Sequence, residues 1–266
     1  MTSFQKLIWN FYKKNKREFP WRNTIDPYKI MVSELMLQQT QTFRVVPKYE
    51  TFLNKFPTIK DLANAKLSEV LELWSGLGYN RRAKFLYQAA KYIVNDLNNV
   101  FPNDEKELIK IPGIGPYTSG AILVFSYNHP LVFIETNIRR VFIHHFFNDQ
   151  ENVSDKQLLV IIEQELDKSN PRDWYYALMD YGVEIAKQFP NPNRKSKQYN
   201  KQSKFEGSLR KVRGEILRQL LKAKTLSIME IEQKIPNETS ERVTHAINSL
   251  EKDGLLVKEE NQLTIQ

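Results

Sequence analysis

Apolar residues between positions 1 and 188 recur at intervals of three and four, whereas strict alternation of apolar and polar residues is scarce. Intervals of three and four are the period of an amphipathic helix, and Pro and Gly interrupt the pattern where helices end. The pattern therefore predicts an all-α main body. The predicted helices cover residues 3–17, 27–40, 43–55, 67–75, 81–97, 104–110, 116–127, 137–147, 155–167 and 172–188.

A second block of periodic sequence follows residue 207. It predicts helices over residues 209–223, 228–235 and 239–252, and then a hairpin around Glu260-Asn261-Gln262. Three helices and a short hairpin are typical of a winged helix-turn-helix, in which the third helix would be the recognition helix. The intervening stretch, residues 190–207, has no apolar periodicity and predicts a loop or linker.

The charge of the chain is unevenly distributed. The 266 residues include 39 basic and 31 acidic side chains, a net charge of +8, which favours a polyanionic partner such as nucleic acid. Residues 205–266 contain ten of each sign, so a winged helix there could pack on protein or bind DNA. The preceding loop can be a solvated linker or can contact phosphate. Its basic residues are Arg194, Lys195, Lys197, Lys201 and Lys204.

The sequence contains no cysteine, which excludes disulfides, thiolate zinc sites and thiolate-bound iron–sulfur clusters. No run of apolar residues approaches eighteen, and residues 1–17 lack the features of a signal peptide. We therefore expect a cytoplasmic protein without a membrane partner. His144 and His145 are adjacent on a predicted helix with no second ligand pair at metal spacing, and we assign them to packing rather than to a metal site.

The strongest local motif is I-P-G-I-G-P-Y-T-S-G-A, residues 111–121. Two glycines one residue apart, between two predicted helices, allow a tight turn whose backbone amides point outward. Such a helix-hairpin-helix turn can bind a DNA phosphate without a charged side chain, and a plain glycine-rich joint is the alternative. The residues predicted to contact DNA here are Pro112, Gly113, Ile114, Gly115, Tyr117 and Thr118.

Two glutamates stand in apolar surroundings. Glu34 lies one turn before Gln38 in a helix that Asp26 can cap and that is apolar on most sides. A carboxylate buried there either pairs with an arginine or with backbone amides, or has the raised pKa that a general acid needs. Glu135 separates a β-like apolar run, residues 131–134, from a helix that Thr136 or Asn137 would cap; that helix N-terminus would keep Glu135 ionised.

Together these segments resemble the helix-hairpin-helix (HhH-GPD) DNA glycosylase superfamily, and in particular the branch of the adenine DNA glycosylase MutY and endonuclease III. The resemblance implies a two-lobed glycosylase domain over residues 1–190, a basic linker over 191–207 and a winged helix-like domain over 208–266. The matching motifs are P-W-R (20–22), S-E-L-M-L-Q-Q-T-Q-T (33–42), L-W-S-G-L-G-Y-N-R-R-A (73–83), I-P-G-I-G-P-Y-T (111–118), E-T-N-I-R-R-V (135–141) and W-Y-Y-A-L-M-D-Y-G (174–182).

The resemblance assigns catalytic roles to the two acids. Glu34 matches the acid that protonates the leaving purine, and Glu135 matches the carboxylate that stabilises the sugar cation or positions water, as the chemistry of glycosidic bonds requires. Tyr117 stands where lyase-competent members carry a Schiff-base lysine, which implies a monofunctional glycosylase without lyase activity.

The resemblance also implies a DNA-contacting set and a base pocket. Gln39 and Tyr79 match residues that wedge into the duplex where the base is extruded. Alternatively, Gln39 only caps the end of its helix and Tyr79 belongs to the core. The remaining implied positions are Gln38 for DNA binding, and Arg22, Glu34 and Tyr176 for the base pocket.

The chain differs from the family pattern at four points. Glu135 replaces an aspartate, the cluster cysteines are missing, Tyr176 replaces a glutamine, and a winged helix takes the place of a Nudix-like domain. We expect a monomer that excises a mispaired or damaged base, adenine first, from double-stranded DNA, without an iron–sulfur cluster and with a monovalent cation at the hairpin backbone. The alternatives are a glycosylase for mismatched thymine or uracil or a modified base, and a non-catalytic DNA-binding protein.

Overall fold

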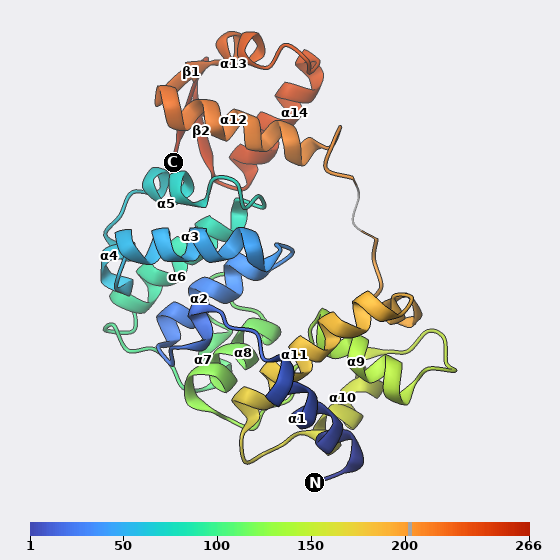
Figure 1. Ribbon diagram of the computed structural model, residues 1–266. Coiled ribbons are helices and arrows are strands. Elements are labelled where there is room, and N and C mark those ends of the chain that lie inside the picture. The colour runs from blue at the N-terminus through green and yellow to red at the C-terminus, as the bar shows by residue number, and fades with distance from the viewer. Residues whose placement is uncertain (202–203) are drawn as a thin grey trace. The chain divides into compact units, whose positions relative to one another are not determined.

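The computed structural model describes residues 1–201 and 204–266 (Figure 1). Up to residue 201 the helices are α1 (Ser3–Asn15), η1 (Pro20–Arg22), α2 (Pro27–Leu37), α3 (Thr42–Lys55), α4 (Ile59–Ala63), α5 (Leu67–Trp74), α6 (Arg81–Asn95), α7 (Glu105–Leu108), α8 (Pro116–Tyr127), α9 (Thr136–Phe146), α10 (Asp155–Glu165), α11 (Pro171–Gln188) and η2 (Pro192–Lys195). The C-terminal segment contains α12 (Leu209–Ala223), β1 (Thr225–Ser227), α13 (Ile228–Lys234), α14 (Ser240–Lys252), β2 (Leu256–Glu259) and β3 (Gln262–Ile265).

The predicted all-α main body is confirmed, and every predicted helix is present with its ends displaced by three residues or fewer. The short helix α4 was not predicted, because five residues are too few to show a period; a capping box between Thr58 and Asp61 starts it. Helix α2 was expected to reach residue 40 but ends at Leu37, because Gln39 adopts a left-handed backbone with φ +54°.

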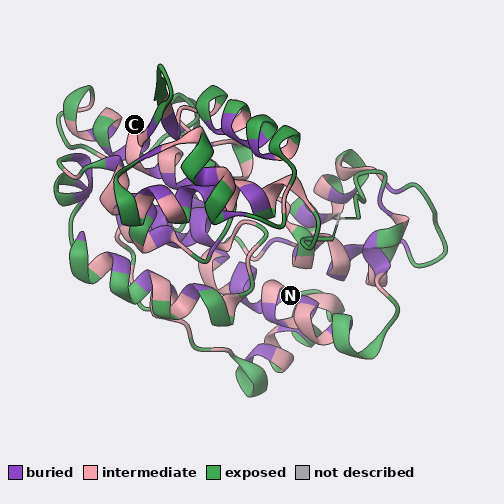
Figure 2. Ribbon diagram, turned by 90° about the horizontal axis from the view of Figure 1, so that it is seen from above, coloured by how far each residue is buried: buried purple, intermediate pink, exposed green. Residues whose placement is uncertain are grey.

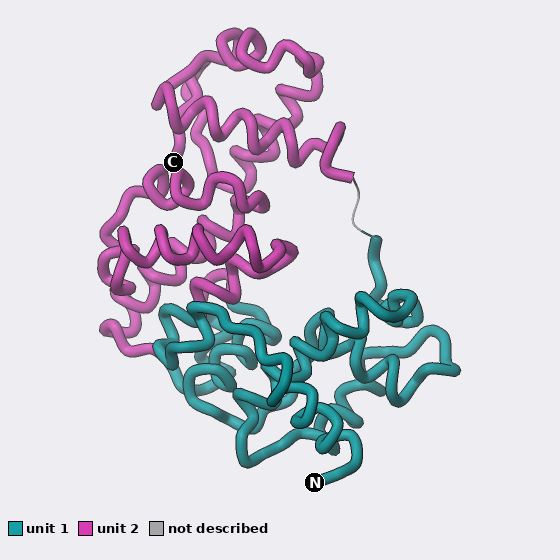
Figure 3. The backbone as a smooth tube through the Cα atoms, viewed as in Figure 1, with its two compact units in different colours: residues 1–30, 102–110, 114–201 teal, residues 31–101, 111–113, 202–266 magenta. Residues whose placement is uncertain are grey.

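The chain divides into two compact units (Figure 3). Unit 1 comprises residues 1–30, 102–110 and 114–201, and unit 2 comprises residues 31–101, 111–113 and 202–266. The main body is thus divided between two units, in agreement with the two-lobed fold that the motifs implied. Along the described residues, no helix combines the length and apolarity needed to span a bilayer.

Unit 1 is organised around α11, which packs against α1 and α9. Trp174, Tyr175 and Phe142 are fully buried there, and Phe4 of α1 meets Phe142 with ring centroids 5.4 Å apart. Burial of such large aromatic side chains is the main stabilising contribution to a helical core. Figure 2 shows buried and exposed positions on different faces of the same helices, as expected for amphipathic helices.

Unit 2 contains the helices α3 to α6 and the C-terminal segment. Phe52, Trp74 and Leu86 are buried among the helices, where α6 packs on α4 and α5. In the C-terminal segment α12 packs on α14, and the antiparallel sheet has the order β1-β3-β2. The expected three helices and hairpin are therefore present, while the three-residue strand β1 was not predicted.

Residues 191–197, the first part of the expected linker, pack on unit 1. Pro192, Asn193 and Ser196 are buried, and Asn193 Nδ2 donates to the carbonyl oxygen of Thr136 at 3.0 Å. A backbone bridge joins residue 196 to Val153. Protein contacts therefore hold this loop, as expected where cluster cysteines are missing. Residues 202 and 203 of the expected linker lie outside the described residues.

Candidate functional site

Glu135 is itself the N-cap of α9, so the prediction that Thr136 or Asn137 caps this helix is wrong. Its Oε1 accepts hydrogen bonds from the backbone amides of Asn137 at 2.6 Å and Ile138 at 2.8 Å. Shorter polar side chains usually occupy this position, because their oxygen reaches the N2 and N3 amides directly. The longer glutamate reaches the same amides, and its Oε2 lies 3.3 Å from Asn137 Nδ2.

The residues before Glu135 do not form the expected β-strand. Phe133 stacks on Tyr175 with ring centroids 4.1 Å apart, and the Tyr175 hydroxyl donates to the carbonyl oxygen of Leu131 at 2.9 Å. Aromatic contacts with α11 therefore position the approach to Glu135. Of residues 131–134 only Phe133 is buried, and no described strand pairs with this run, so the β-like pattern did not give a strand.

The electrostatic environment of Glu135 differs from the expected one. Burial raises the pKa of Glu135 above its ordinary value, and the two backbone amides and Arg140 offset only part of this effect. The stabilising helix N-terminus is present as expected, but desolvation outweighs it. Arg140 Nη1 donates to Asn137 Oδ1 at 2.6 Å and to the carbonyl oxygen of Gly182 at 2.9 Å, which links α9 to α11 next to the carboxylate.

Glu34 occupies the middle of α2 and is only 5% exposed. The neighbouring side chains Met31, Val32, Leu35 and Met36 are buried as well, so the predicted burial of this acid is confirmed. Glu34 belongs to unit 2 and Glu135 to unit 1.

Two exposed side chains of unit 2 have a left-handed backbone. Gln39, just after α2, has φ +54°, and Tyr79, just before α6, has φ +48°. Residues other than glycine adopt this conformation rarely, because it costs free energy. Residues in such conformations cluster at functional sites. Tyr79 is 36% exposed, so the alternative that it belongs to the core is wrong.

Arg82, a residue that the sequence reasoning missed, connects these two positions. Its buried guanidinium donates to the carbonyl oxygens of Leu35 at 2.7 Å, Gln38 at 2.6 Å and Gly78 at 3.0 Å. It thereby satisfies the carbonyls at the C-terminus of α2 and ties them to the loop before α6. Burial lowers the pKa of Arg82 to about 10. The motif G-L-G-Y-N-R-R contains two adjacent arginines, and the sequence alone does not show which of them is buried.

The helix-hairpin-helix turn joins α7 to α8. Gly113 has φ +79°, and a Cβ atom there would lie 2.4 Å from the Phe85 Cβ, so this position requires glycine. Gly115 caps α8 with φ −99° and has open space around it, so the requirement for glycine is confirmed at Gly113 only. The side chains of Ile114 and Thr118 are buried, which leaves the backbone as the group they can offer a ligand.

Tyr117 lies in the first turn of α8 and is partly exposed. Its ring meets Phe133 edge to face with centroids 5.7 Å apart. The aromatic residue at the position of the family's lysine therefore packs against the segment that leads to Glu135.

Arg22 and Tyr176 are in contact in unit 1. Arg22 is held there by Asp180, a residue that the sequence reasoning did not single out. Asp180, with its side chain 1% exposed, accepts two hydrogen bonds from the Arg22 guanidinium at 2.8 Å and one from Arg17 Nε at 2.6 Å. The Arg22 guanidinium lies 4.5 Å from the ring centre of Tyr176, and the Tyr176 ring stacks on Phe125 with centroids 4.5 Å apart. A bidentate ion pair thus holds Arg22 in place.

The two histidines pack as predicted. His145 Nε2 lies 3.1 Å from the Tyr181 hydroxyl, and burial lowers the pKa of His145 to about 4. His144 packs on the ring of Phe189. Within the described parts of the chain, no group of three or more His, Asp or Glu side chains could hold a metal ion.

The hairpin, the buried acid of α2 and the helix-capping acid of α9 define a helix-hairpin-helix protein with two carboxylates in different environments. Residues 32–165, which include both acids, match the family described as "HhH-GPD superfamily base excision DNA repair protein". The chain belongs to this superfamily, and the resemblance of its motifs is confirmed.

Named relatives indicate which branch of the superfamily the chain is similar to. The chain is 39% identical over 185 residues to an adenine DNA glycosylase of Buchnera aphidicola, a match that covers 69% of this chain and 53% of that relative. It is 32% identical over 198 residues to the human adenine DNA glycosylase, covering 70% of this chain and 36% of the relative. The chain thus spans about half the length of the Buchnera relative and about a third of the length of the human one. Its fold is similar to that of a thermostable thymine-DNA glycosylase, with a TM-score of 0.61 and 27% identity over 69% of this chain and 86% of that one.

Proposed function

We propose that this protein is a monofunctional DNA glycosylase, which extrudes a mispaired or damaged base from duplex DNA and hydrolyses its N-glycosidic bond. The observation that carries the proposal is the pair of carboxylates, one buried in α2 and one capping α9, within the segment that matches the family. Adenine is the first candidate base, because the named relatives are adenine DNA glycosylases. The protein acts as a monomer on double-stranded DNA.

The two acids divide the reaction between them. Glu34 donates a proton to a ring nitrogen of the base, and the bond between C1′ and that base breaks with its electron pair passing to the base. Glu135 faces the positive charge that develops on the sugar and accepts the proton of the water that adds to C1′. A carboxylate with a raised pKa is a better proton acceptor near neutral pH, which suits this second role.

The exposed, left-handed residues Gln39 and Tyr79 support extrusion of the base. A base in a stacked duplex is out of reach of both acids, so the nucleotide has to leave the helix and its place has to be filled. An exposed aromatic ring on a loop that Arg82 holds in position can enter the gap and stack on the neighbouring bases.

Tyr117 supports hydrolysis without strand cleavage. A lyase forms an imine between an amine and C1′ of the sugar, and a phenol cannot form one. The expected result is that borohydride traps no covalent protein–DNA adduct during turnover. A Tyr117→Lys variant is the matched control, because it supplies the amine at the same position; trapping by the unmodified protein would contradict the assignment.

The cofactors follow from the ligands that the chain offers. An iron–sulfur cluster does not fit, because the chain has no cysteine to bind it. The hairpin offers backbone carbonyls, which can coordinate a monovalent cation. Such a cation would assist the hairpin in holding a DNA phosphate.

The decisive experiment is single-turnover excision on a panel of labelled duplexes. The panel contains adenine opposite oxidised guanine, G·T and G·U mismatches, hypoxanthine and alkylated bases, and alkali reveals the abasic product. We expect product on the adenine duplex, and loss of it with Glu34→Gln and with Glu135→Gln. Full excision by either variant would overturn the mechanism, and tight binding without product on any duplex would identify a non-catalytic DNA-binding protein.

Thymine opposite guanine is the second candidate substrate. The similarity in fold to a thymine-DNA glycosylase favours it. So does Tyr176, which stands where the family's adenine branch carries a glutamine. The phenol has a single hydroxyl that both donates and accepts, whereas an amide has a carbonyl oxygen that accepts and a separate NH₂ group that donates. The two side chains therefore form hydrogen bonds with different base edges. Excision from the G·T duplex with none from the adenine duplex would select this candidate.

A further inference from the structure

Unit 2 contains a cleft of about 980 Å³ whose one wall is helix α12 of the C-terminal segment. The lining residues of α12 recur at intervals of three and four, so they form a single face of the helix. Figure 1 labels this helix, which packs on α5 of the same unit. The main members of the lining face are Arg210, Arg213, Gly214, Leu217, Arg218 and Leu221.

The opposite wall contains the two residues proposed to enter the duplex, Gln39 and Tyr79, together with Gln38. Three further arginines, Arg44, Arg81 and Arg82, line this wall. Over both walls the described lining residues include six arginines and one carboxylate, that of Asp253. Three of the six, Arg210, Arg213 and Arg218, come from α12, so this face of the C-terminal segment is more positive than the balanced composition of residues 205–266.

Direct contacts hold the two walls together. The Arg210 guanidinium donates to the Tyr79 hydroxyl and lies 5.3 Å from the centre of its ring. The carbonyl oxygen of Asp253, a residue of the C-terminal segment, accepts from Lys84 Nζ of α6 at 2.8 Å. Within the C-terminal segment, the Asp253 carboxylate accepts from Arg213 at 2.5 Å. The C-terminal segment is thereby bound to the loop that carries Tyr79, and Arg210 can position that ring as well as bind a ligand.

Gly214 shows that the cleft has room for a ligand close to the helix backbone. It lies in the interior of α12, where glycine is less favourable than alanine, yet a Cβ atom built on it meets nothing within 4 Å. Packing within this chain therefore does not require glycine at this position. A partner that approaches the helix backbone would require it.

We propose that this cleft binds the phosphodiester backbone of DNA beside Tyr79, so that α12 is the DNA-contacting helix of the C-terminal segment. Guanidinium groups bind phosphate oxygens through paired donors, and the exposed rings of Tyr79 and Phe205 among them suit stacking on bases. The sequence pattern favoured α14 as the recognition helix. On that helix Arg242 pairs with Glu238 at 2.7 Å, and its second guanidinium nitrogen donates to the carbonyl oxygen of Gly207.

The proposal rests on the proposed function, because the DNA in the cleft is the substrate duplex. Its test uses the full chain and a duplex with a tetrahydrofuran abasic analogue, which binds without reaction. Affinity is measured over a series of salt concentrations. Each phosphate contact contributes about 0.9 to the slope of log affinity against log salt. We expect Arg218→Ala to lower both the affinity and this slope by about one contact, since Arg218 pairs only with Glu215 of its own helix among the described ion pairs.

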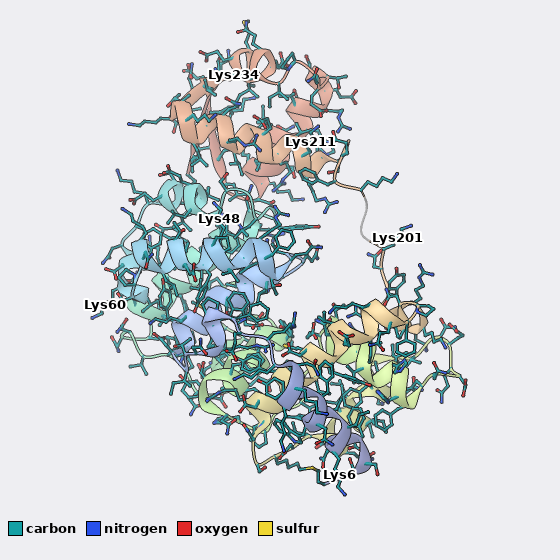
Figure 4. The ribbon with its side chains drawn as sticks, in the orientation of Figure 1. Lys6, Lys48, Lys60, Lys201, Lys211 and Lys234 are labelled. Carbon is teal, nitrogen blue, oxygen red and sulfur yellow. The ribbon has the colours of Figure 1, made fainter. Side chains whose placement is uncertain are left out.

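Lys211→Ala is the matched control. Lys211, which Figure 4 labels, lies on α12 outside the lining face. The substitution therefore removes the same charge from the same helix. Gly214→Glu places a carboxylate in the cleft and is expected to weaken binding at least about tenfold, because like charges repel at short range. Gly214→Ala checks folding, with an expected rise in Tm of about 2–4 °C.

Wild-type affinity and slope for Arg218→Ala and Gly214→Glu would overturn the proposal, as would an equal loss for Lys211→Ala. The excision assay separates this outcome from failure of the proposed function. If the protein excises a base but the α12 variants do not change the salt slope, only the proposal that the cleft binds DNA is overturned. If binding depends on Arg218 but no base is excised, the proposed enzymatic activity is overturned and the proposal for the cleft stands.

Discussion

Gly182 in α11 is the position where a single methyl group tests the link between packing and the proposed catalytic acid. A Cβ atom there would lie 2.6 Å from the carbonyl oxygen of Asn137 and 2.7 Å from its Cβ. Ordinary van der Waals contact begins near 3.4 Å, so the first contact is about 0.8 Å too short. The clash is with the backbone of α9, which cannot yield as the end of a flexible side chain can.

The size of the effect follows from these distances. Overpacking of this kind costs about 1–3 kcal/mol, and exchanging glycine for alanine inside a helix returns about 0.5–1 kcal/mol. We therefore expect Gly182→Ala to lower the free energy of unfolding by about 1–2 kcal/mol. Because the amide of Asn137 binds Glu135, α9 would carry the carboxylate with it; a displacement near 1 Å can reduce the rate about 100-fold. We expect a loss of single-turnover excision of about 10- to 100-fold.

Urea unfolding measures the stability, and single-turnover excision at saturating protein measures the rate. Gly214→Ala is the control for stability, since nothing lies within 4 Å of the added atom; it should raise the free energy of unfolding by about 0.5–1 kcal/mol. The reasoning fails if Gly182→Ala unfolds and reacts as the unmodified protein does. It also fails if both alanine variants lose stability to the same degree.

Three further predictions concern buried charges. Arg82→Ala should lower the free energy of unfolding by about 3–5 kcal/mol, because it leaves several buried carbonyl oxygens without a donor; an effect under about 1 kcal/mol in urea unfolding would contradict this. Asp180→Asn should cost about 3–5 kcal/mol by leaving the Arg22 guanidinium buried without its counter-charge, and a Tm equal to that of the unmodified protein would refute it. Glu135→Gln should retain the cap of α9, because an amide oxygen also accepts the two backbone N–H groups. Burial raises the pKa of Glu135, so its stabilising contribution is complete below the ordinary value of 4.5 and declines as pH rises through the raised value. The unmodified protein should therefore lose stability relative to Glu135→Gln as the pH rises above 4.5, and a difference that is constant or of opposite sign would refute the burial argument.

The local features of the protein could be read from the sequence. The intervals of apolar residues predicted the helices, including those of the C-terminal segment, because each helix buries one face of its own residues. The burial of Glu34 followed in the same way from the apolar side chains around it on one helix. The tight turn at Gly113 and the membership of the superfamily rested on short motifs of contiguous residues.

Features that depend on partners distant in sequence were decided by the tertiary structure. Asp180 binds Arg22 across 158 positions, and Arg82 binds carbonyls 44 to 47 positions earlier, so no local pattern could pair them. Arg210 reaches Tyr79 across 131 positions.

Glu135 shows both sides of this division. The sequence alone determined that an acid stands at the start of a helix, because the apolar run and the helical period meet there. Only the tertiary structure decided that the acid caps the helix itself and that its pKa is raised. The physical reason is that a helix N-terminus is a local property of the chain, whereas desolvation depends on every element that packs around the carboxylate and excludes water from it.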